Sequence, residues 1–205
     1  MIPAPEALTR LRDGNRRFAA DIRGSTILAG RTSRADFLDS QEPFAIVLGC
    51  SDSRVPVEVV FDQGFGDLFV IRVAGNIVAP SQVGSVEFAA ARFGIRAVVV
   101  MGHTRCGAID ATLDELLQPA GGHSANMRSI VDRIRPSVEG LVHTELRHDR
   151  KALANEAVRA NVRASADHLR HGSEVLERLI QGDGLMVVGA EYSLDTGIVD
   201  FFDGV

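Results

Sequence analysis

The chain has 205 residues, of which 45% are hydrophobic and 24% are charged, a balance typical of one globular domain over residues 1–205. Its formal net charge of -5 gives no electrostatic reason to expect nucleic acid or an anionic membrane surface as a partner. No apolar run approaches the roughly 20 residues that span a bilayer. The N-terminus also lacks the apolar stretch of a secretory signal, so we expect a cytoplasmic protein.

Apolar residues recur along the chain at helical spacing in some segments and as short continuous runs in others. The first segment, residues 5–20, has the spacing of an amphipathic helix. Continuous apolar runs then predict buried strands over residues 44–48, 68–73, 97–101 and 185–188. Between and after them, the pattern predicts helices over 82–93 and 107–117, a surface loop over 118–124, and mostly helical structure over 125–182.

The end of the chain carries a turn signal, Asp195-Thr196-Gly197, before an apolar segment over 198–202. Buried, β-branched strands that alternate with helices are typical of a parallel sheet with helices on both faces. We therefore predict an α/β fold with a mostly parallel central sheet flanked by helices. An N-terminal helical arm and a C-terminal edge strand complete this prediction.

The two cysteines of the chain and one histidine directly follow predicted strands. The first strand runs into Cys50, and the third runs into His103 and Cys106. Because ligands of open parallel sheets bind beyond the carboxyl ends of the strands, we expect these side chains to meet at one edge. Two thiolates and one imidazole favour zinc, and the two residues between His103 and Cys106 let one loop hold the metal from two sides. The pattern predicts a Zn²⁺ site.

Two metal-free alternatives share this spacing, namely a buried structural cysteine pair and a redox pair. The position of both motifs at strand ends argues against them. A closed structural zinc site needs four protein ligands, whereas a catalytic site leaves one position to water. With three ligands in reach, the fourth position falls to water or to Asp52.

Asp52 and Arg54 follow Cys50 with one residue between them. Alternate residues of an extended segment share a side, so the two side chains are expected to pair. An exposed pair of this kind usually contributes little to stability. Beside a metal it has a second use, because an ionised carboxylate orients a water ligand.

Several segments closely resemble the β-class carbonic anhydrases. They are CSDSRVP at 50–56, GHTRCGAI at 102–109, GDLFVIRVAGN at 66–76, SVEFAAARFGI at 85–95, LRDGNRRF at 11–18 and GAEYSLDTGIV at 189–199. The resemblance covers nearly the whole chain. It implies a lyase that hydrates carbon dioxide reversibly to bicarbonate and a proton, with zinc as cofactor. It also implies a homodimer or tetramer with active sites at the subunit interface, and we expect the N-terminal helix to pack on a partner chain.

The resemblance also assigns roles to single residues. It implies Cys50, His103 and Cys106 as zinc ligands and Asp52 with Arg54 as the catalytic dyad, with Asp52 on the metal only in a closed state. Gln41 stands where the plant-like subgroup places a substrate-binding glutamine, and Gly107 resembles the residue whose backbone N–H faces the substrate. Phe69, Ala74 and Phe88 occupy positions that line the apolar pocket, partly from the neighbouring subunit. Some members carry Val and Tyr in place of Ala74 and Phe88, so the pocket is expected to be wider and to lack a hydroxyl.

A further comparison within that family predicts an open site. Some bacterial members hold a regulatory bicarbonate between a Trp, an Arg and a Tyr, and this favours a closed site. This chain has Val47, Arg72 and Phe88 at those positions. We therefore expect the plant-like, open-site form, with Asp52 paired to Arg54.

Two other functions remain as alternatives. A related zinc hydrolase of carbonyl sulfide or carbon disulfide would use the same metal site and differ in pocket shape. A non-catalytic zinc or redox-sensing domain is the second alternative. Asp52, Arg54 and Gln41 argue against it, because a structural zinc ion needs none of them.

Overall fold

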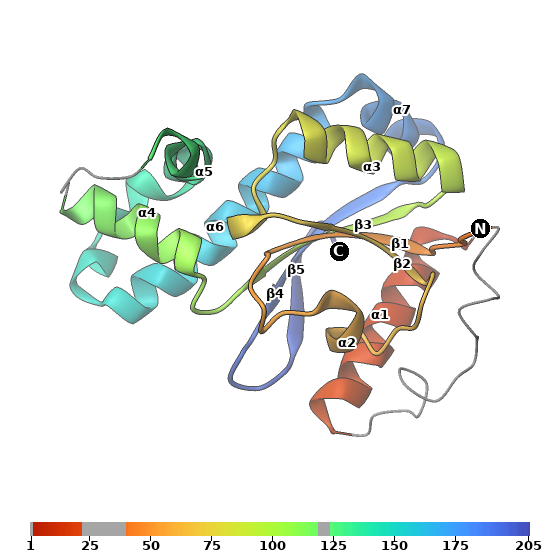
Figure 1. Cartoon of the computed structure of the whole chain (residues 1–205), viewed down its shortest axis with the longest axis horizontal. Coiled ribbons are helices and arrows are strands. Elements are labelled where there is room, and N and C mark those ends of the chain that lie inside the picture. Colours follow the sequence, from red (N-terminus) through yellow and green to blue (C-terminus); the bar gives the residue numbers. More distant parts are fainter. Residues whose placement is uncertain (1, 22–39, 119–123) are drawn as a thin grey trace.

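One five-stranded sheet forms the centre of the computed structural model, which describes residues 2–21, 40–118 and 124–205. The strands lie in the order β2-β1-β3-β4-β5, and only the β4–β5 pair is antiparallel (Figure 1). Their bounds are β1 Ala45–Gly49, β2 Leu68–Arg72, β3 Ala97–His103, β4 Met186–Tyr192 and β5 Val199–Asp203. The predicted α/β class, the mostly parallel sheet and the C-terminal edge strand are confirmed.

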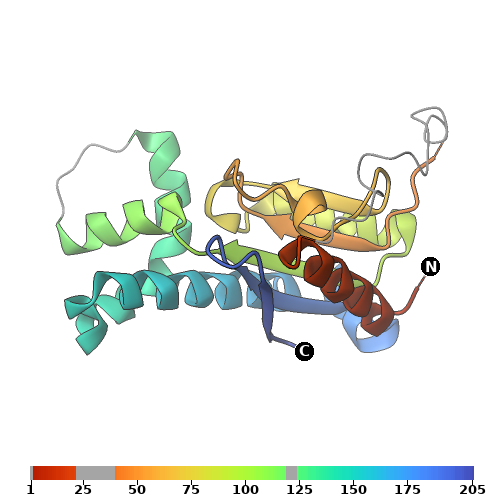
Figure 2. The same cartoon turned by 90° about the horizontal axis from the view of Figure 1, so that it is seen from below.

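Helices cover both faces of this sheet (Figures 1 and 2). One face carries α3 (Pro80–Phe93), α6 (Arg150–His171) and α7 (Glu174–Gly182), and the other carries α1 (Ala4–Ala19) and α2 (Val57–Val60). Helices α4 (Gly107–Leu117) and α5 (Ala125–Val138) lie beyond the carboxyl ends of the strands. Short 3-10 helices occupy Ala74–Asn76 (η2), Glu139–His143 (η3) and Glu145–His148 (η4).

Alternate side chains of the central strands pack into two separate hydrophobic cores on opposite faces of the sheet. Val47 and Val99 pack on the side of α1 and α2, whereas Ile46 and Val98 pack on the side of α3, α6 and α7. Because both faces are buried, these strands read in the sequence as continuous apolar runs rather than as alternating ones. A third core beyond the strand ends is built by α4, α5 and α6 and includes both cysteines.

Several boundaries differ from the predicted ones. Strand β4 continues to Tyr192, because its ladder with β3 extends to the pair His103↔Tyr192, although Glu191 interrupts the apolar run. Helix α3 begins at Pro80, a residue suited to the first turn of a helix. Helix α2 was not predicted, since four residues are too few for a helical period. Residues 119–123 of the predicted loop, with His123, lie outside the described residues.

The apolar stripe of the N-terminal helix packs on the sheet of its own chain, and its packing on a partner chain stays a prediction. Ala7, Leu8 and Leu11 of α1 are buried against the sheet of the same chain. The Asn15 amide donates to the carbonyl oxygens of Val60 at 3.1 Å and Gly197 at 2.9 Å, and its Oδ1 accepts from Val199 N–H at 2.8 Å. The apolar stripe of this helix is therefore already covered within its own chain.

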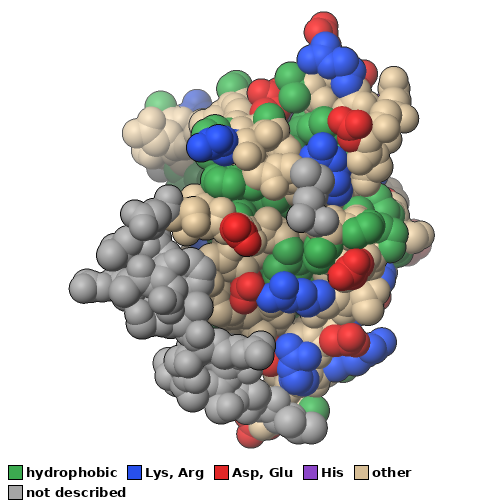
Figure 3. Space-filling view, turned by 90° about the vertical axis from the view of Figure 1, so that its right-hand side faces the viewer, with side chains coloured by type: hydrophobic (Ala, Val, Ile, Leu, Met, Phe, Trp, Pro, Cys, Tyr) green, Lys and Arg blue, Asp and Glu red, His purple; other side chains and the backbone are tan. Residues whose placement is uncertain are grey.

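Charges of both signs are interspersed on the surface. On the face shown in Figure 3, Lys and Arg side chains alternate with Asp and Glu among the described residues. Across the described parts of the chain, no helix has the length and apolar character needed to traverse a membrane.

Candidate metal centre

The neighbouring strands β1 and β3 bring three side chains that could ligate a metal to one edge of the sheet. Cys50 directly follows β1, His103 is the last residue of β3, and Cys106 is the N-cap residue of α4. The two strands are paired in parallel, so their carboxyl ends coincide. The ligand atoms of the three side chains all lie within 4.8 Å of one another. The sequence placed these residues at one edge, and the structure brings them together.

The donor set fits a zinc ion. The sulfur atoms of Cys50 and Cys106 lie 4.0 Å apart, and both thiols are free and buried. Two thiolates on a tetrahedral zinc, each at about 2.3 Å from the metal, would be separated by about 3.8 Å. A disulfide would require about 2.05 Å between the sulfurs. The observed spacing matches shared coordination far better than a disulfide bond.

The Nε2 atom of His103 lies beside the two thiols and lacks a hydrogen-bond partner among the described residues. Its Nδ1 donates to the Thr104 carbonyl oxygen at 2.9 Å, which leaves Nε2 as the acceptor nitrogen of the ring. Nε2 is buried and has no hydrogen-bond partner among the residues that the structure describes. An unsatisfied buried acceptor is costly, and a metal ion held with the two sulfurs would satisfy it.

Hydrogen bonds within the ligand set favour one thiolate. The Cys106 thiol, followed by His103 and the Gly75 N–H, holds the pKa of Cys50 below its usual range despite burial. The pKa of Cys106 is raised, because its thiol is held by Cys50 and is buried. Burial lowers the pKa of His103, but its contacts with Cys50 outweigh this and raise it overall. Metal binding requires both cysteines as thiolates and His103 as the neutral imidazole, so it releases protons from this set.

Asp52 and Arg54 form the predicted pair. Arg54 donates from Nε to Oδ1 at 3.0 Å and from Nη2 to Oδ2 at 2.7 Å, and its backbone N–H reaches Oδ1 at 2.9 Å. These bonds hold the pKa of Asp52 well below its usual range. Asp52 Oδ2 lies 3.9 Å from His103 Nε2. An ionised, oriented carboxylate therefore stands beside the ligand set.

Two further residues shape the site and were missed as such by sequence reasoning. Arg72 donates from Nε to the Cys50 carbonyl oxygen at 2.9 Å and from Nη2 to that of Asp52 at 2.6 Å. Asn161 Nδ2 donates to the Gly75 carbonyl oxygen at 2.8 Å, and Gly75 N–H reaches Cys50 Sγ at 3.4 Å. Arg72 is the last residue of β2, which pairs with β1, and this position was its only signal in the sequence. The sequence around Asn161 gave no sign of its role.

Glycine is required at position 75. Its φ of 68° lies in the left-handed region, and an added Cβ would lie 2.9 Å from Ile134 Cδ1 and 3.0 Å from Ala108 Cβ. The η2 peptide that contacts the Cys50 sulfur therefore packs directly against α4 and α5.

The remaining predicted site residues lie around the ligand set or apart from it. Gly107 opens α4, and a Cβ there would meet nothing within 4 Å, so its backbone borders open space. Ala74 opens η2 and is half-buried. The Phe69 ring packs 6.2 Å from that of Phe88, which is 55% exposed. Gln41 is exposed and makes no hydrogen bond to the described parts of the chain.

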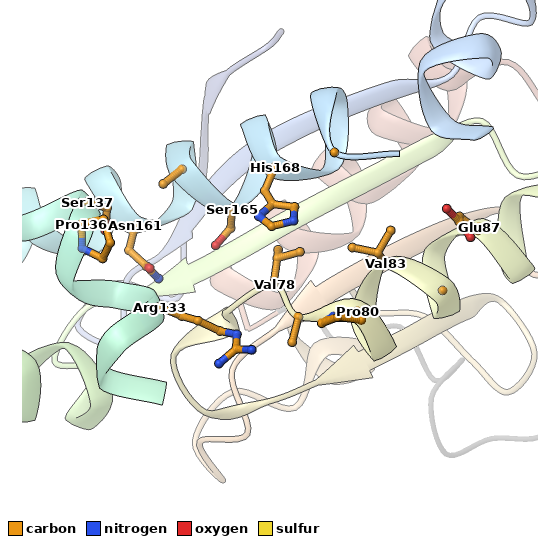
Figure 4. Close-up of a pocket in the computed structure, with 14 residues that line it drawn as sticks. Val78, Pro80, Val83, Glu87, Arg133, Pro136, Ser137, Asn161, Ser165 and His168 are labelled. Atoms are coloured by element: carbon orange, nitrogen blue, oxygen red, sulfur yellow. The ribbon is translucent and has the colours of Figure 1, made fainter. Parts of the chain in front are cut away.

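A large cavity lies apart from the three clustered side chains. It has a volume of about 710 Å³ and lies between α3, α5 and α6, and none of the three ligand residues lines it. Figure 4 shows Arg133 and Glu87 towards opposite ends of the group of residues that lines this cavity. Asn161 connects the two regions, since it lines the cavity and donates to the Gly75 carbonyl oxygen.

Comparisons with known proteins agree with this geometry. A family model described as "Carbonic anhydrase" matches residues 45–199. The chain is 35% identical to carbonic anhydrase 2 of Mycobacterium tuberculosis over 189 residues, 91% of this chain and 87% of that protein. It is 43% identical to a carbonic anhydrase of Mycolicibacterium smegmatis over 133 residues, 62% and 61% of the two chains. It also resembles a solved structure from a study of two tetrameric β-carbonic anhydrases of Sordaria macrospora. That match has a TM-score of 0.71 at 25% identity and covers 80% of this chain and 82% of the other.

Proposed function

The chain belongs to the β-class carbonic anhydrase family and hydrates carbon dioxide reversibly to bicarbonate and a proton, and we propose that Cys50, His103 and Cys106 hold a zinc ion for this reaction. One observation carries the proposal. The three ligand atoms lie within 4.8 Å of one another, beside a carboxylate that Arg54 keeps ionised.

The residues around the ligand set have separate tasks in the proposed mechanism. A bound zinc ion would supply Lewis acidity that lowers the pKa of a water ligand towards roughly 7. Asp52 accepts a hydrogen bond from the attacking water and thereby points a lone pair of the water oxygen at carbon dioxide. Arg54 holds both carboxylate oxygens of Asp52 in place for this task. The ionised state of Asp52 makes it an acceptor only, which sets the orientation of the attacking oxygen.

Carbon dioxide is small and apolar, so it needs few polar contacts. We assign the Gly107 N–H, in the first turn of α4, to the oxygen that gains charge during attack. The Gln41 amide is assigned to the same substrate, and Phe69, Ala74 and Phe88 to the apolar wall. Because Phe88 and Gln41 are exposed in the single chain, they would reach a pocket of a neighbouring subunit.

Purified protein is expected to carry about one zinc per chain and to accelerate carbon dioxide hydration in stopped-flow assays. Carbonyl sulfide and carbon disulfide should be assayed in parallel, since the same ligand set would serve them. Faster turnover of either gas would favour the related hydrolase. Bound zinc without turnover of any of the three would favour the non-catalytic zinc or redox-sensing domain.

We further propose that residues 1–205 act as one cytoplasmic domain that assembles as a homodimer or tetramer, with no nucleic acid or membrane partner. In support, strand β2 is paired on one side only within the described residues, and Phe65 and Phe88 are 77% and 55% exposed. Exposed aromatic side chains beside an open sheet edge are typical of a surface that is covered in an assembly.

We expect an open site at neutral pH, in which Asp52 stays with Arg54 and leaves the fourth metal position to solvent. Both Asp52 oxygens are held by Arg54. Val47 is buried in the sheet and has no polar group, and Arg72 Nε and Nη2 already donate to two carbonyl oxygens, which argues against a regulatory bicarbonate held there. A crystal structure of the zinc-loaded protein near pH 8 is expected to show the pair intact, and bicarbonate inhibition is expected to be non-cooperative. Asp52 bound to zinc at that pH, or steeply cooperative inhibition, would contradict this expectation.

A further inference from the structure

The peptide between the ligands His103 and Cys106 has an unusual backbone. Arg105 has a φ of 57°, in the left-handed region that residues with a side chain rarely adopt. Such a conformation persists only when its surroundings hold it. Contacts with neighbouring segments must therefore hold Arg105 in this conformation.

Arg105 uses this conformation to support the catalytic pair. Its carbonyl oxygen accepts a hydrogen bond from Arg54 Nη2 at 3.2 Å. The same Nη2 donates to Asp52 Oδ2 at 2.7 Å. Arg54 thus bridges the Asp52 carboxylate and the Arg105 peptide. A change in the Arg105 backbone would move one of the two anchors of the guanidinium group.

The turn between β4 and β5 holds this segment from the other side. Thr104 N–H donates to the Tyr192 carbonyl oxygen at 3.0 Å, and Leu194 N–H donates to Thr104 Oγ1 at 3.0 Å. The Arg105 guanidinium is paired with the Asp195 carboxylate. Main-chain bonds fix Thr104, whereas the pair with Asp195 is the side-chain contact that reaches Arg105 itself.

Hydrogen bonds hold the turn between β4 and β5 to the rest of the chain. Ser193 N–H donates to the Ile198 carbonyl oxygen and Gly197 N–H to that of Ser193, both at 2.9 Å. Asn15 of α1 then bonds the Gly197 carbonyl at 2.9 Å and the Val199 N–H at 2.8 Å. Asp195 therefore projects from a segment tied to both the sheet and the N-terminal helix.

We propose that Asp195 is a positioning residue for carbon dioxide hydration. Through Arg105 it holds the left-handed peptide whose carbonyl oxygen orients Arg54, and Arg54 in turn orients Asp52. This inference rests on the proposed function of the Asp52–Arg54 pair. Exposure alone would predict no role, since the Arg105 and Asp195 side chains are 64% and 54% exposed and such pairs usually contribute little.

The test compares Asp195→Asn with Asp13→Asn, which removes a similarly exposed ion pair between Asp13 and Arg16 of α1. Asp195→Asn is expected to lower kcat about tenfold with little change in KM, whereas Asp13→Asn leaves both unchanged. Asp195→Glu should restore much of kcat. In an Arg54→Ala background, Asp195→Asn should have no further effect, because its influence passes through Arg54.

A readout independent of turnover is the Arg54 Nε–H signal in NMR spectra of the purified protein. Asp195→Asn should broaden this signal and hasten its exchange with solvent, while Asp13→Asn should not. Wild-type kcat with an unchanged Arg54 signal would overturn the proposal, as would an equal loss of kcat in the Arg54→Ala background. If Asp52→Asn impairs hydration and Asp195→Asn does not, the positioning role of Asp195 fails but the proposed function stands. If the wild-type protein does not hydrate carbon dioxide, the proposed function fails, and the Arg54 signal still decides whether Asp195 positions the pair.

Discussion

Replacement of Cys50, His103 or Cys106 by Ala is expected to remove the zinc and to abolish carbon dioxide hydration. Each variant leaves two protein ligands, fewer than a catalytic zinc site uses. The loss should be severe, because the three side chains are almost fully buried and the chain has no other cysteine to substitute for either thiolate. Zinc per chain, measured by mass spectrometry, and the hydration rate in stopped flow are expected to fall together.

His168→Ala is the matched control, since His168 is an exposed histidine that lines the cavity between α3, α5 and α6, and none of the three proposed ligands lines that cavity. It should keep its zinc and its rate. A Cys50→Ala protein with full zinc and full turnover would show that the ligand assignment is wrong. Thermal unfolding of each variant, with and without added zinc, separates the loss of a ligand from the loss of the fold.

Asp52→Asn is expected to keep most of the zinc and yet to slow hydration by about two orders of magnitude or more, as loss of a positioned acid–base group does. Asn has the shape of Asp, but its NH₂ group would face Arg54 or the attacking water as a donor. Arg54→Ala should slow the reaction similarly. It should also lower the stability of the fold, because it leaves a largely buried carboxylate without its main partner.

The effect of pH on this pair has a definite sign. Bonds from Arg54 lower the pKa of Asp52 in the folded protein. The pair therefore stabilises the fold above the ordinary Asp pKa, near 3.9, and loses that contribution as the pH falls below it. Wild type and Arg54→Ala should thus differ in unfolding temperature at pH 7 and converge in strong acid.

Glu156→Gln serves as the control for the pair, since it disrupts an ion pair with Arg163 on α6 whose side chains are 42% and 45% exposed. It should leave zinc, rate and stability nearly unchanged. Near wild-type rates in both Asp52→Asn and Arg54→Ala would reduce the catalytic pair to a structural salt bridge.

Local patterns in the sequence were sufficient for the main strands and helices and for the gathering of Cys50, His103 and Cys106 at one sheet edge. The central strands are buried on both faces, so each appears as a continuous apolar run, and the residues after each run necessarily lie at the same edge of a parallel sheet. Cys50, His103 and Cys106 could therefore be assigned from their positions after two runs. Asp52 and Arg54 could be paired because two residues of separation place them on one side of an extended segment.

Tertiary structure alone decided how that site is held. Asn161 lies 86 residues from the Gly75 carbonyl that it bonds, and Asp195 lies 90 residues from Arg105. Neither has a local pattern that marks its role, because a polar residue on a helix or in a turn reads the same whether it faces solvent or a distant backbone. The packing of α1 on its own sheet was likewise invisible in the sequence. An amphipathic stripe indicates that one face of a helix is buried, but the surface that covers this face depends on how the whole chain folds.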